Sequence, residues 1–368
     1  MKHCDKKAVT VNPTNKCNLR CEYCMASSAE EQENIIRIPL DFAFAGIWDA
    51  LQGIPTGIKA DILRFFSPGE PTQAMDIIRA CTEYAKELDP AIIVELQTNG
   101  LFPTMEDTEW IAENMDVVWF SLDGPKEIND LHRPDESGNG RTQEIERNMA
   151  FVQKKAFAGV RATVVEEMME KQDELVAYYA SLGIDYICLN PIIRQIKRND
   201  DAQENVERND IMTFAKNFLK AYRYGLEHDI KVSSSLSFNF DQQTDLCCRS
   251  CFPMPQLNPD GSVSSCDMAL YKDTKKSLQC FVYGEWDSET KAIRYFNNKI
   301  EVLRSRTLDN LPKCKNCDAR IYCAGGCAGR VAFQTGSIFD IIPENCAAIR
   351  YLAHNIICGR NIIAHTHP

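Results

Sequence analysis

The sequence predicts an α/β protein in which a partial barrel of six strand–helix units is followed by a small cysteine-rich domain. Between residues 8 and 191, strand-like apolar segments alternate with segments whose apolar residues recur at i, i+3 and i+4. The strand-like segments are apolar on both faces, as in a parallel sheet covered by helices. Six units are two short of a complete eight-stranded barrel. Most of the 17 cysteines lie between residues 247 and 358.

We expect three segments along the chain. The barrel covers residues 1–193, a connector covers 194–245, and the cysteine-rich domain covers 246–368. The connector begins with polar residues and continues into one long amphipathic helix at 211–228. In the last segment the sequence PDG at 259–261 has the chemistry of a tight turn, so we expect a β-hairpin there and a helix near the C-terminus.

The composition limits the partners and the location that we expect. There are 41 Lys and Arg against 52 Asp and Glu, a formal charge of −11, so the broad basic surface of nucleic-acid-binding proteins is missing and we expect no nucleic acid partner. No segment resembles a signal peptide or is long enough to cross a bilayer, so we expect a cytoplasmic protein without a membrane partner. Cytosolic thiols are reduced, so the cysteines indicate metal or redox chemistry.

Three cysteines, Cys17, Cys21 and Cys24, lie in one loop behind the first predicted strand. Their spacing is too tight and too uneven for a zinc ribbon, which needs two separated pairs. Three thiolates can hold three irons of a cubane cluster and leave the fourth iron open. An open iron can bind the amino and carboxylate groups of S-adenosylmethionine and pass an electron to its sulfonium, which yields a 5'-deoxyadenosyl radical.

With Tyr23 as the aromatic residue, the loop matches Cys-X3-Cys-X-aromatic-Cys, and the sequence resembles the radical S-adenosylmethionine (radical SAM) superfamily. SPGEP at 67–71 resembles that family's Gly-Gly-Glu-Pro turn, whose backbone and Glu bind the methionine ammonium, although Pro68 replaces the first Gly. QTNG at 97–100 and SLDGP at 121–125 resemble segments that line the ribose and carboxylate. The resemblance implies cofactor contacts from Tyr23, Gly69, Glu70, Asn99, Ser121, Asp123, Arg133 and Asn190.

The C-terminal cysteines resemble SPASM, a module that binds auxiliary iron–sulfur clusters. Two cubane clusters need eight thiolates; the SPASM pattern supplies seven, and Cys247 or Cys248 supplies the eighth. The resemblance implies that the first auxiliary cluster is held by one of these two residues with Cys251, Cys266 and Cys327. It implies a second on Cys314, Cys317, Cys323 and Cys346. Together with the radical-forming cluster this makes three [4Fe-4S] clusters, and zinc on the same cysteines is the alternative.

The resemblance also implies a function. The class includes anaerobic sulfatase-maturating enzymes and ribosomal-peptide maturases, and we expect an anaerobic oxidoreductase that oxidises a side chain of a peptide or protein. The auxiliary clusters would relay the released electron, and flavodoxin or ferredoxin is the implied electron donor. Asp267, directly after Cys266, stands where the sulfatase-maturating enzymes carry the base that deprotonates the substrate.

Two other functions remain open. One is dehydrogenation or epimerisation of a small molecule such as a sugar or an aminocyclitol, in which Cys188 or the spare member of Cys247/Cys248 would return a hydrogen atom. The other is a non-catalytic zinc protein. Sulfatase itself is not implied as the substrate, because MASS at 25–28 lacks the aromatic pair that the sulfatase-maturating enzymes place after the third cysteine.

Overall fold

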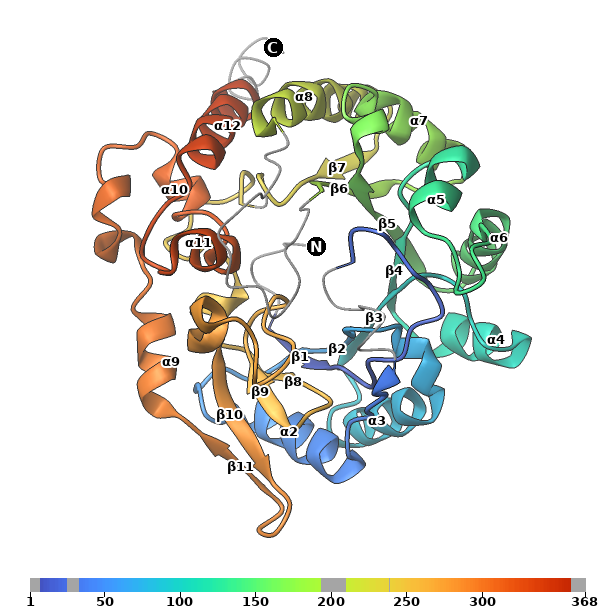
Figure 1. Ribbon diagram of the computed structural model, residues 1–368, viewed down its shortest axis with the longest axis vertical. Coiled ribbons are helices and arrows are strands. Elements are labelled where there is room, and N and C mark those ends of the chain that lie inside the picture. The colour runs from blue at the N-terminus through green and yellow to red at the C-terminus, as the bar shows by residue number, and fades with distance from the viewer. Residues whose placement is uncertain (1–6, 25–32, 193–209, 238, 359–368) are drawn as a thin grey trace.

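The structure is a computed structural model that describes residues 7–24, 33–192, 210–237 and 239–358. One sheet of 11 strands curves into an incomplete barrel with helices around its outside (Figure 1). The strand order is β11-β10-β9-β8-β1-β2-β3-β4-β5-β6-β7, and the strands from β8 to β7 run parallel. This confirms the predicted α/β fold. The polar start of the predicted connector and the sequence MASS lie outside the described residues.

The parallel part of the sheet contains the six predicted strands and two more. Its strands are β1 (Ala8–Val11), β2 (Ile62–Phe65), β3 (Ile93–Thr98), β4 (Val117–Ser121), β5 (Phe157–Val164), β6 (Tyr186–Pro191), β7 (Lys231–Ser233) and β8 (Gln256–Leu257). The antiparallel part consists of β9 (Ser262–Ser264), β10 (Val282–Asp287) and β11 (Ala292–Tyr295). β8 and β9 form the predicted hairpin. The sequence does not predict β7, because three residues, two of them polar, are too few to show an apolar pattern.

The helices cover the outside of the barrel and one end of the sheet. Around the barrel lie α2 (Leu40–Gln52), α3 (Met75–Leu88), α4 (Met105–Asn114), α5 (Lys126–His132), α6 (Thr142–Val152), α7 (Gln172–Ser181) and α8 (Ile211–Glu227). The C-terminal part adds α9 (Asn297–Arg304), α10 (Arg320–Cys323), α11 (Ala328–Thr335), α12 (Pro343–Ala353) and a π-helical turn at His354–Cys358. Short 3-10 helices lie at η2 (Pro71–Ala74), η3 (Glu166–Met168), η4 (Arg249–Cys251), η5 (Lys276–Phe281), η6 (Leu308–Asn310) and η7 (Pro312–Cys314).

The long helix predicted at 211–228 is α8, and its start has a clear local cause. The side chain of Asp210 accepts hydrogen bonds from the backbone N–H groups of Met212 and Thr213, at 3.0 and 3.1 Å. This N-cap satisfies donors that have no partner inside the helix. α12 packs beside α8 (Figure 1), so the end of the cysteine-rich part closes against the last helix of the barrel.

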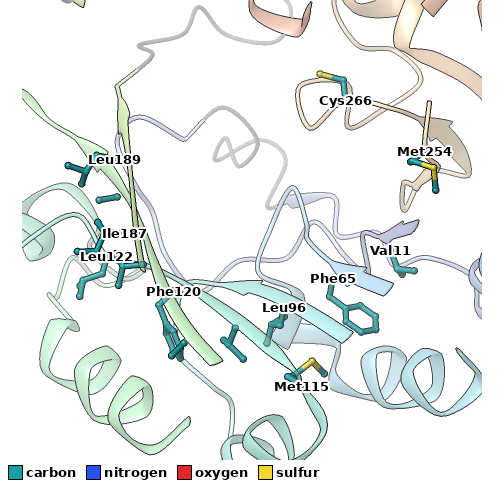
Figure 2. Packing of buried hydrophobic residues seen from close by; sticks show 14 of the residues in the cluster. Val11, Phe65, Leu96, Met115, Phe120, Leu122, Ile187, Leu189, Met254 and Cys266 are labelled. Carbon is teal, nitrogen blue, oxygen red and sulfur yellow. The ribbon is translucent and has the colours of Figure 1, made fainter. Parts of the chain in front are cut away.

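The outer face of the strands is apolar as predicted, whereas the inner face is apolar only in part and also carries polar residues. One face packs its apolar side chains, such as Phe65, Leu96 and Phe120, against the helices (Figure 2). Burying one such side chain contributes about 1.5 to 3 kcal/mol. Neighbouring residues in a strand point to opposite faces, so Arg64 and Gln97 lie on the inner face. The inner face therefore has the polar side chains that a reaction centre needs.

No described helix has both the length and the apolar character required to span a bilayer.

The turn between β2 and η2 packs directly on the chain that leads from β1 to the first cysteines. The backbone N–H of Glu70 donates a hydrogen bond to the Lys16 carbonyl oxygen at 2.8 Å, and the Ser67 hydroxyl donates to the Thr14 carbonyl. A methyl group at Gly69 would lie 2.2 Å from the Lys16 carbonyl oxygen and 2.4 Å from the Asn15 carbonyl carbon. The close approach of two backbones therefore requires glycine at this position.

We predict that Gly69→Ala destabilises the protein by about 1 to 3 kcal/mol and lowers the amount of iron bound per chain, because the added methyl group pushes on the backbone before Cys17. Unfolding in denaturant and iron analysis measure the two effects. Gly138→Ala is the control, since a methyl group there meets nothing within 4 Å and only the left-handed backbone is strained. Full stability of Gly69→Ala would contradict the close packing.

Candidate active site

The first three cysteines follow β1 at the carboxyl edge of the parallel strands. Cys17 and Cys21 are partly buried, and Cys24 is exposed. Burial raises the pKa of Cys17 to about 12, with smaller contributions from Glu70 and the thiols of Cys21 and Cys24. Burial likewise raises the pKa of Cys21 to about 11, although the nearby Arg133 opposes the shift. Three neighbouring thiols in one loop fit the three-thiolate iron–sulfur cluster that the resemblance implies, and iron binding would have to displace their protons.

Tyr23, Asp123 and Arg133, predicted from three separate motifs, form one hydrogen-bonded group. The Tyr23 hydroxyl donates to Asp123, and the Arg133 Nη1 donates to the Tyr23 oxygen at 2.9 Å. Asp123 is fully buried and also accepts the backbone N–H of Thr163 at 2.8 Å. The group ties the cysteine loop to the ends of β4 and β5, so it fixes the position of the loop in the barrel.

A second attachment of the cysteine loop is not predicted by the sequence. The ring of His132, the last residue of α5, lies between two carboxylates: Nδ1 is 2.5 Å from Glu22 Oε1 and Nε2 is 3.2 Å from Glu167 Oε2. The backbone N–H of Glu22 also donates to the His132 carbonyl oxygen at 3.2 Å. Glu22 stands between Cys21 and Tyr23, so His132 anchors the loop directly beside its second cysteine.

Glu70 joins the SPGEP turn to the QTNG segment at the end of β3. Its Oε1 accepts the backbone N–H and the hydroxyl of Thr72 at 3.1 and 2.8 Å and the hydroxyl of Thr98 at 2.7 Å. Its Oε2 accepts the backbone N–H of Asn99 at 2.7 Å. The residue is only 2% exposed, and burial raises the pKa of the carboxyl despite these donors. Oε2 keeps an acceptor position that a ligand ammonium could use.

The other predicted cofactor contacts gather at the same edge of the sheet. The Asn99 side chain donates to Asn18 Oδ1 at 2.7 Å, so it also contacts the cysteine loop. Ser121 is the last residue of β4 and is partly buried. Asn190, in β6, accepts the backbone N–H of Ser235 at 2.9 Å and approaches the Cys188 sulfur at 3.4 Å. Carboxyl ends of parallel strands are where α/β barrels carry their active sites, so the edge is the candidate site.

Five of the C-terminal cysteines lie together near η4. They are Cys247, Cys248, Cys251, Cys266 and Cys327. Hydrogen bonds from Cys247 and Cys251 hold the pKa of Cys248 well below its usual value. Burial raises the pKa values of Cys266 and Cys327, and the nearby Cys248 thiol adds to both shifts. Cys248 is thus close to each of the other predicted ligands of the first auxiliary cluster.

The remaining four predicted ligands form a second group. They are Cys314, Cys317, Cys323 and Cys346. Burial raises the pKa of Cys323 to about 12, and the thiols of the other three add to the shift. Within the described residues, no three His, Cys, Asp or Glu side chains converge as the ligands of a single metal ion would. Each group has at least the four neighbouring cysteines that a cubane cluster needs, whose thiolates are spread over its corners.

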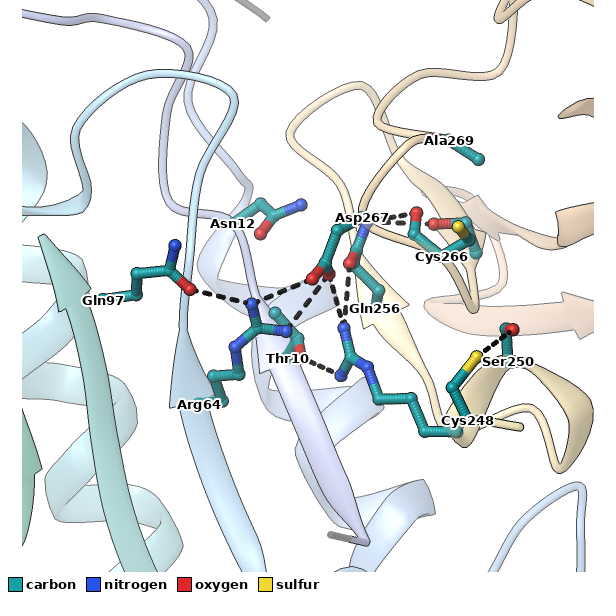
Figure 3. Close-up of polar contacts among 12 residues, drawn as sticks. Thr10, Asn12, Arg64, Gln97, Cys248, Ser250, Gln256, Cys266, Asp267 and Ala269 are labelled. Carbon is teal, nitrogen blue, oxygen red and sulfur yellow. Dashed lines mark hydrogen bonds and ion pairs between the residues drawn. The ribbon is translucent and has the colours of Figure 1, made fainter. Parts of the chain in front are cut away.

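Asp267 lies between the barrel and the cysteine-rich part (Figure 3). Arg64 of β2 donates to both of its carboxylate oxygens at 3.1 Å, and Arg249 donates to Oδ1 at 2.6 Å. Arg64 also donates to Gln97 of the QTNG segment at 3.2 Å. The side chain of Asp267 is 40% exposed, whereas that of Arg64 is only 8% exposed. A substrate can therefore reach the carboxylate but not the guanidinium that holds it.

The two arginines determine the charge of Asp267. Burial works to raise the pKa of its carboxyl, but the guanidinium groups of Arg64 and Arg249 outweigh burial and hold the pKa well below its usual range. Asp267 is therefore ionised at neutral pH and is a weak base. The sequence does not reveal Arg64, because Arg64 and Asp267 are 203 residues apart. Arg249 is only 18 residues from Asp267, but no motif or periodicity links the two.

Comparison with known proteins supports the resemblance. Residues 11–178 match the family model of the Radical SAM superfamily. A cysteine-type anaerobic sulfatase-maturating enzyme from Clostridium novyi is 23% identical over 339 residues, which cover 85% of this chain and 85% of the relative. The match includes the cysteine-rich C-terminal part, whose cysteine spacing is that of SPASM.

Two solved structures have the same fold. The structure of native anSMEcpe with bound AdoMet matches with a TM-score of 0.74 at 19% identity and covers 97% of this chain and 98% of that chain. Streptococcus suis SuiB bound to precursor peptide SuiA matches with a TM-score of 0.64 at 14% identity, over 94% of this chain and 76% of that chain. The predicted barrel with an added cysteine-rich part is therefore confirmed.

We predict that Glu70→Gln destabilises the protein by about 1 to 3 kcal/mol, because the NH2 group that replaces one carboxylate oxygen cannot accept a hydrogen bond and leaves a buried donor without a partner. It should also weaken S-adenosylmethionine binding by roughly tens-fold through loss of the charge-assisted contact. Denaturant unfolding and equilibrium binding measure these effects. Thr98→Val is the matched control: it removes one donor, keeps the carboxylate, and should retain cofactor affinity. Unchanged affinity in Glu70→Gln would limit Glu70 to a structural role.

Proposed function

The chain contains a radical SAM domain and is homologous to anaerobic sulfatase-maturating enzymes, and we propose that it is an oxidoreductase that modifies a side chain of a peptide or protein. The peptide class is supported by the likeness to SuiB, a structure of which is bound to a precursor peptide. The observation that carries the proposal is the position of Asp267. An accessible, ionised carboxylate lies beside a predicted cluster ligand, Cys266, and is held by the barrel residue Arg64.

The implied cofactors would be held by the residues gathered above. Cys17, Cys21 and Cys24 would hold the first cluster, and the carboxylate of Glu70 would accept the methionine ammonium of S-adenosylmethionine. The two C-terminal groups would hold two auxiliary clusters, and we take Cys248 as the fourth ligand of the first because its thiol is near Cys251, Cys266 and Cys327. When bound, the cofactors supply a radical that takes a hydrogen atom from the substrate and an acceptor for the electron that the oxidation releases.

The part of the reaction assigned to the protein is a proton transfer. The substrate carbon that loses a hydrogen atom carries an O–H or S–H group, and oxidation to the double bond requires that proton to leave with the electron. Asp267 Oδ2 would accept the proton, while Arg64 and Arg249 keep the carboxylate ionised and oriented. The carboxylate and the neighbouring Cys266 place the proton acceptor beside the proposed electron acceptor.

We predict that anaerobically reconstituted protein binds about twelve irons per chain, with broad absorption typical of thiolate-bound cubanes. Replacing Cys17, Cys21 and Cys24 together by Ala should leave about eight irons and abolish 5'-deoxyadenosine formation, because only the first cluster would be lost. Iron analysis and chromatography of the nucleoside measure the outcome. Cys81→Ala is the control, since Cys81 is a buried thiol of α3 outside the three groups. Stoichiometric zinc in place of iron would refute the proposed function.

We predict that Asp267→Asn keeps its iron and still forms 5'-deoxyadenosine, while product falls by about 10² or more, because the amide cannot accept the substrate proton. Mass spectrometry of a candidate peptide quantifies the product. Asp309→Asn, an exposed position in η6, is the control. The low pKa of Asp267 also predicts that wild-type activity shows no loss from its protonation near neutral pH.

Three results would contradict this role. Loss of iron in Asp267→Asn would mean that the residue shapes the cluster loop, and wild-type product formation would remove it from the reaction. Uptake of solvent deuterium at the reacting carbon, lost in Cys188→Ala, would favour epimerisation with the inner-face thiol of Cys188 as the hydrogen donor.

A further inference from the structure

Arg306 is a buried cation in the cysteine-rich part of the protein. It follows α9 and is 1% exposed. No carboxylate of the described residues lies within ion-pair distance of its guanidinium; its polar contacts are to backbone carbonyls and one sulfur. A buried charge is strongly unfavourable unless a charge of opposite sign or a full set of hydrogen bonds compensates it. The compensation of Arg306 therefore has to come from these contacts and not from Asp or Glu.

The guanidinium uses its five N–H donors in five contacts. Nε donates to the Ile338 carbonyl oxygen at 2.6 Å. Nη1 donates to the Ala324 carbonyl at 3.2 Å, and Nη2 donates to the carbonyls of Gly325 and Gly326 at 2.9 and 3.1 Å. The fifth donor, on Nη1, points to the sulfur of Cys251 at 3.9 Å. The four neutral carbonyls accept hydrogen bonds but carry no negative charge. The contact with the Cys251 sulfur is therefore the one that can supply a counter-charge.

The contacts place Arg306 between the two auxiliary cysteine groups. Three of the four carbonyls come from residues 324–326, the loop that connects Cys323 of the second group to Cys327 of the first. Ala324, Gly325 and Gly326 all have positive φ values, of 47°, 80° and 72°. Three consecutive left-handed residues are unusual, and here they form a loop whose carbonyls converge on the guanidinium. Arg306 therefore holds together the short link between the two groups.

The sulfur that faces the guanidinium belongs to the first auxiliary group. Nη1 of Arg306 donates toward Cys251, which lies in one group with Cys248. Cys251 and Cys248 are both ligands in the proposed assignment. A cubane bound by four thiolates carries a net negative charge, which increases when it accepts an electron.

We propose that Arg306 is the counter-charge of the first auxiliary cluster and a positioning residue that makes this cluster a better electron acceptor. A fixed positive charge and an N–H directed at a ligand sulfur both stabilise the reduced form, so they raise the reduction potential. The inference rests on the proposed function, since it requires that these cysteines bind iron–sulfur clusters. It adds that one residue sets how readily the cluster takes the electron released by substrate oxidation.

The test compares Arg306→Gln, which removes the charge, with Arg306→Lys, which keeps the charge but lacks the five-donor fork. Arg304→Gln, an exposed position at the end of α9, is the matched control. All three changes are made in the full chain that also carries Cys17, Cys21 and Cys24 replaced by Ala, so that only auxiliary clusters contribute. Each protein is reconstituted with iron and sulfide, and its reduction is followed by potentiometric titration with electron paramagnetic resonance detection.

We compare the variants at the midpoint potential of the parent protein. There we expect the Gln variant to have a ratio of reduced to oxidised cluster at least tenfold lower than that of the parent. For a one-electron couple, a tenfold change in this ratio corresponds to a shift of about 59 mV in the reduction potential. The reduction potential of the Lys variant should stay closer to that of the parent, and the potential of Arg304→Gln should equal that of the parent. If the Gln variant is insoluble or binds no iron, retention of iron by the Lys variant supports the proposal, because Lys keeps the positive charge that Gln lacks although both variants lose the five-donor fork.

Equal reduction potentials of the Gln and Lys variants, or equal loss of iron or solubility in both, would overturn the proposal and limit Arg306 to holding the 324–326 loop. A potential in the Gln variant equal to that of the parent would overturn it as well. Failure of the proposed function gives a different result: the parent protein itself would then bind no auxiliary iron.

Discussion

The arrangement of the whole site depends on β1, which is hydrogen-bonded along both edges. On one side it pairs with β2, and on the other it pairs with β8 of the cysteine-rich part. The backbone N–H of Thr10 donates to the Pro255 carbonyl at 2.8 Å, and the side chain of Asn12 donates to Asn258 at the same distance in the buried interior. The cysteine loop starts directly after this strand. The shared strand thus places the first cysteines and the auxiliary groups on one continuous sheet.

Buried arginines hold together the functional groups that the shared strand brings close to one another. Arg64 and Arg249 are compensated by Asp267, and Arg133 is compensated by Asp123. For Arg306 we propose that the first auxiliary cluster has this role. Removing one partner of such a pair leaves a buried charge, which typically costs about 3 to 5 kcal/mol. Each pair therefore fixes the position of two segments relative to each other, because the guanidinium stays buried only while its anion lies beside it. This explains how side chains from distant segments are held at defined positions.

The sequence predicts local features of this protein well and long-range ones poorly. The cysteine loop, the helix α8 and the β8–β9 hairpin follow from spacing and turn chemistry within about 20 residues. The contact of His132 with Glu22 spans 110 residues, and that of Arg306 with Cys251 spans 55, so no local pattern reveals them. Glu70, which the sequence predicts as a cofactor contact, is buried and has four internal donors that its motif does not predict. Charge pairs form where segments that are distant in the sequence come together in the folded chain, and only the structure shows where that happens.

The low pKa of Asp267 constrains the order of events if this residue is the proposed base. A carboxylate held by two guanidinium groups is too weak a base to take a proton from an ordinary alcohol or thiol. Loss of a hydrogen atom from the adjacent carbon makes the same O–H or S–H far more acidic, because its deprotonation then leads toward a stable double bond. Proton transfer to Asp267 would therefore become favourable only after hydrogen abstraction and together with loss of the electron to its acceptor. Arg64 and Arg249, by weakening the base, would protect an unreacted substrate from deprotonation and couple proton loss to the radical step.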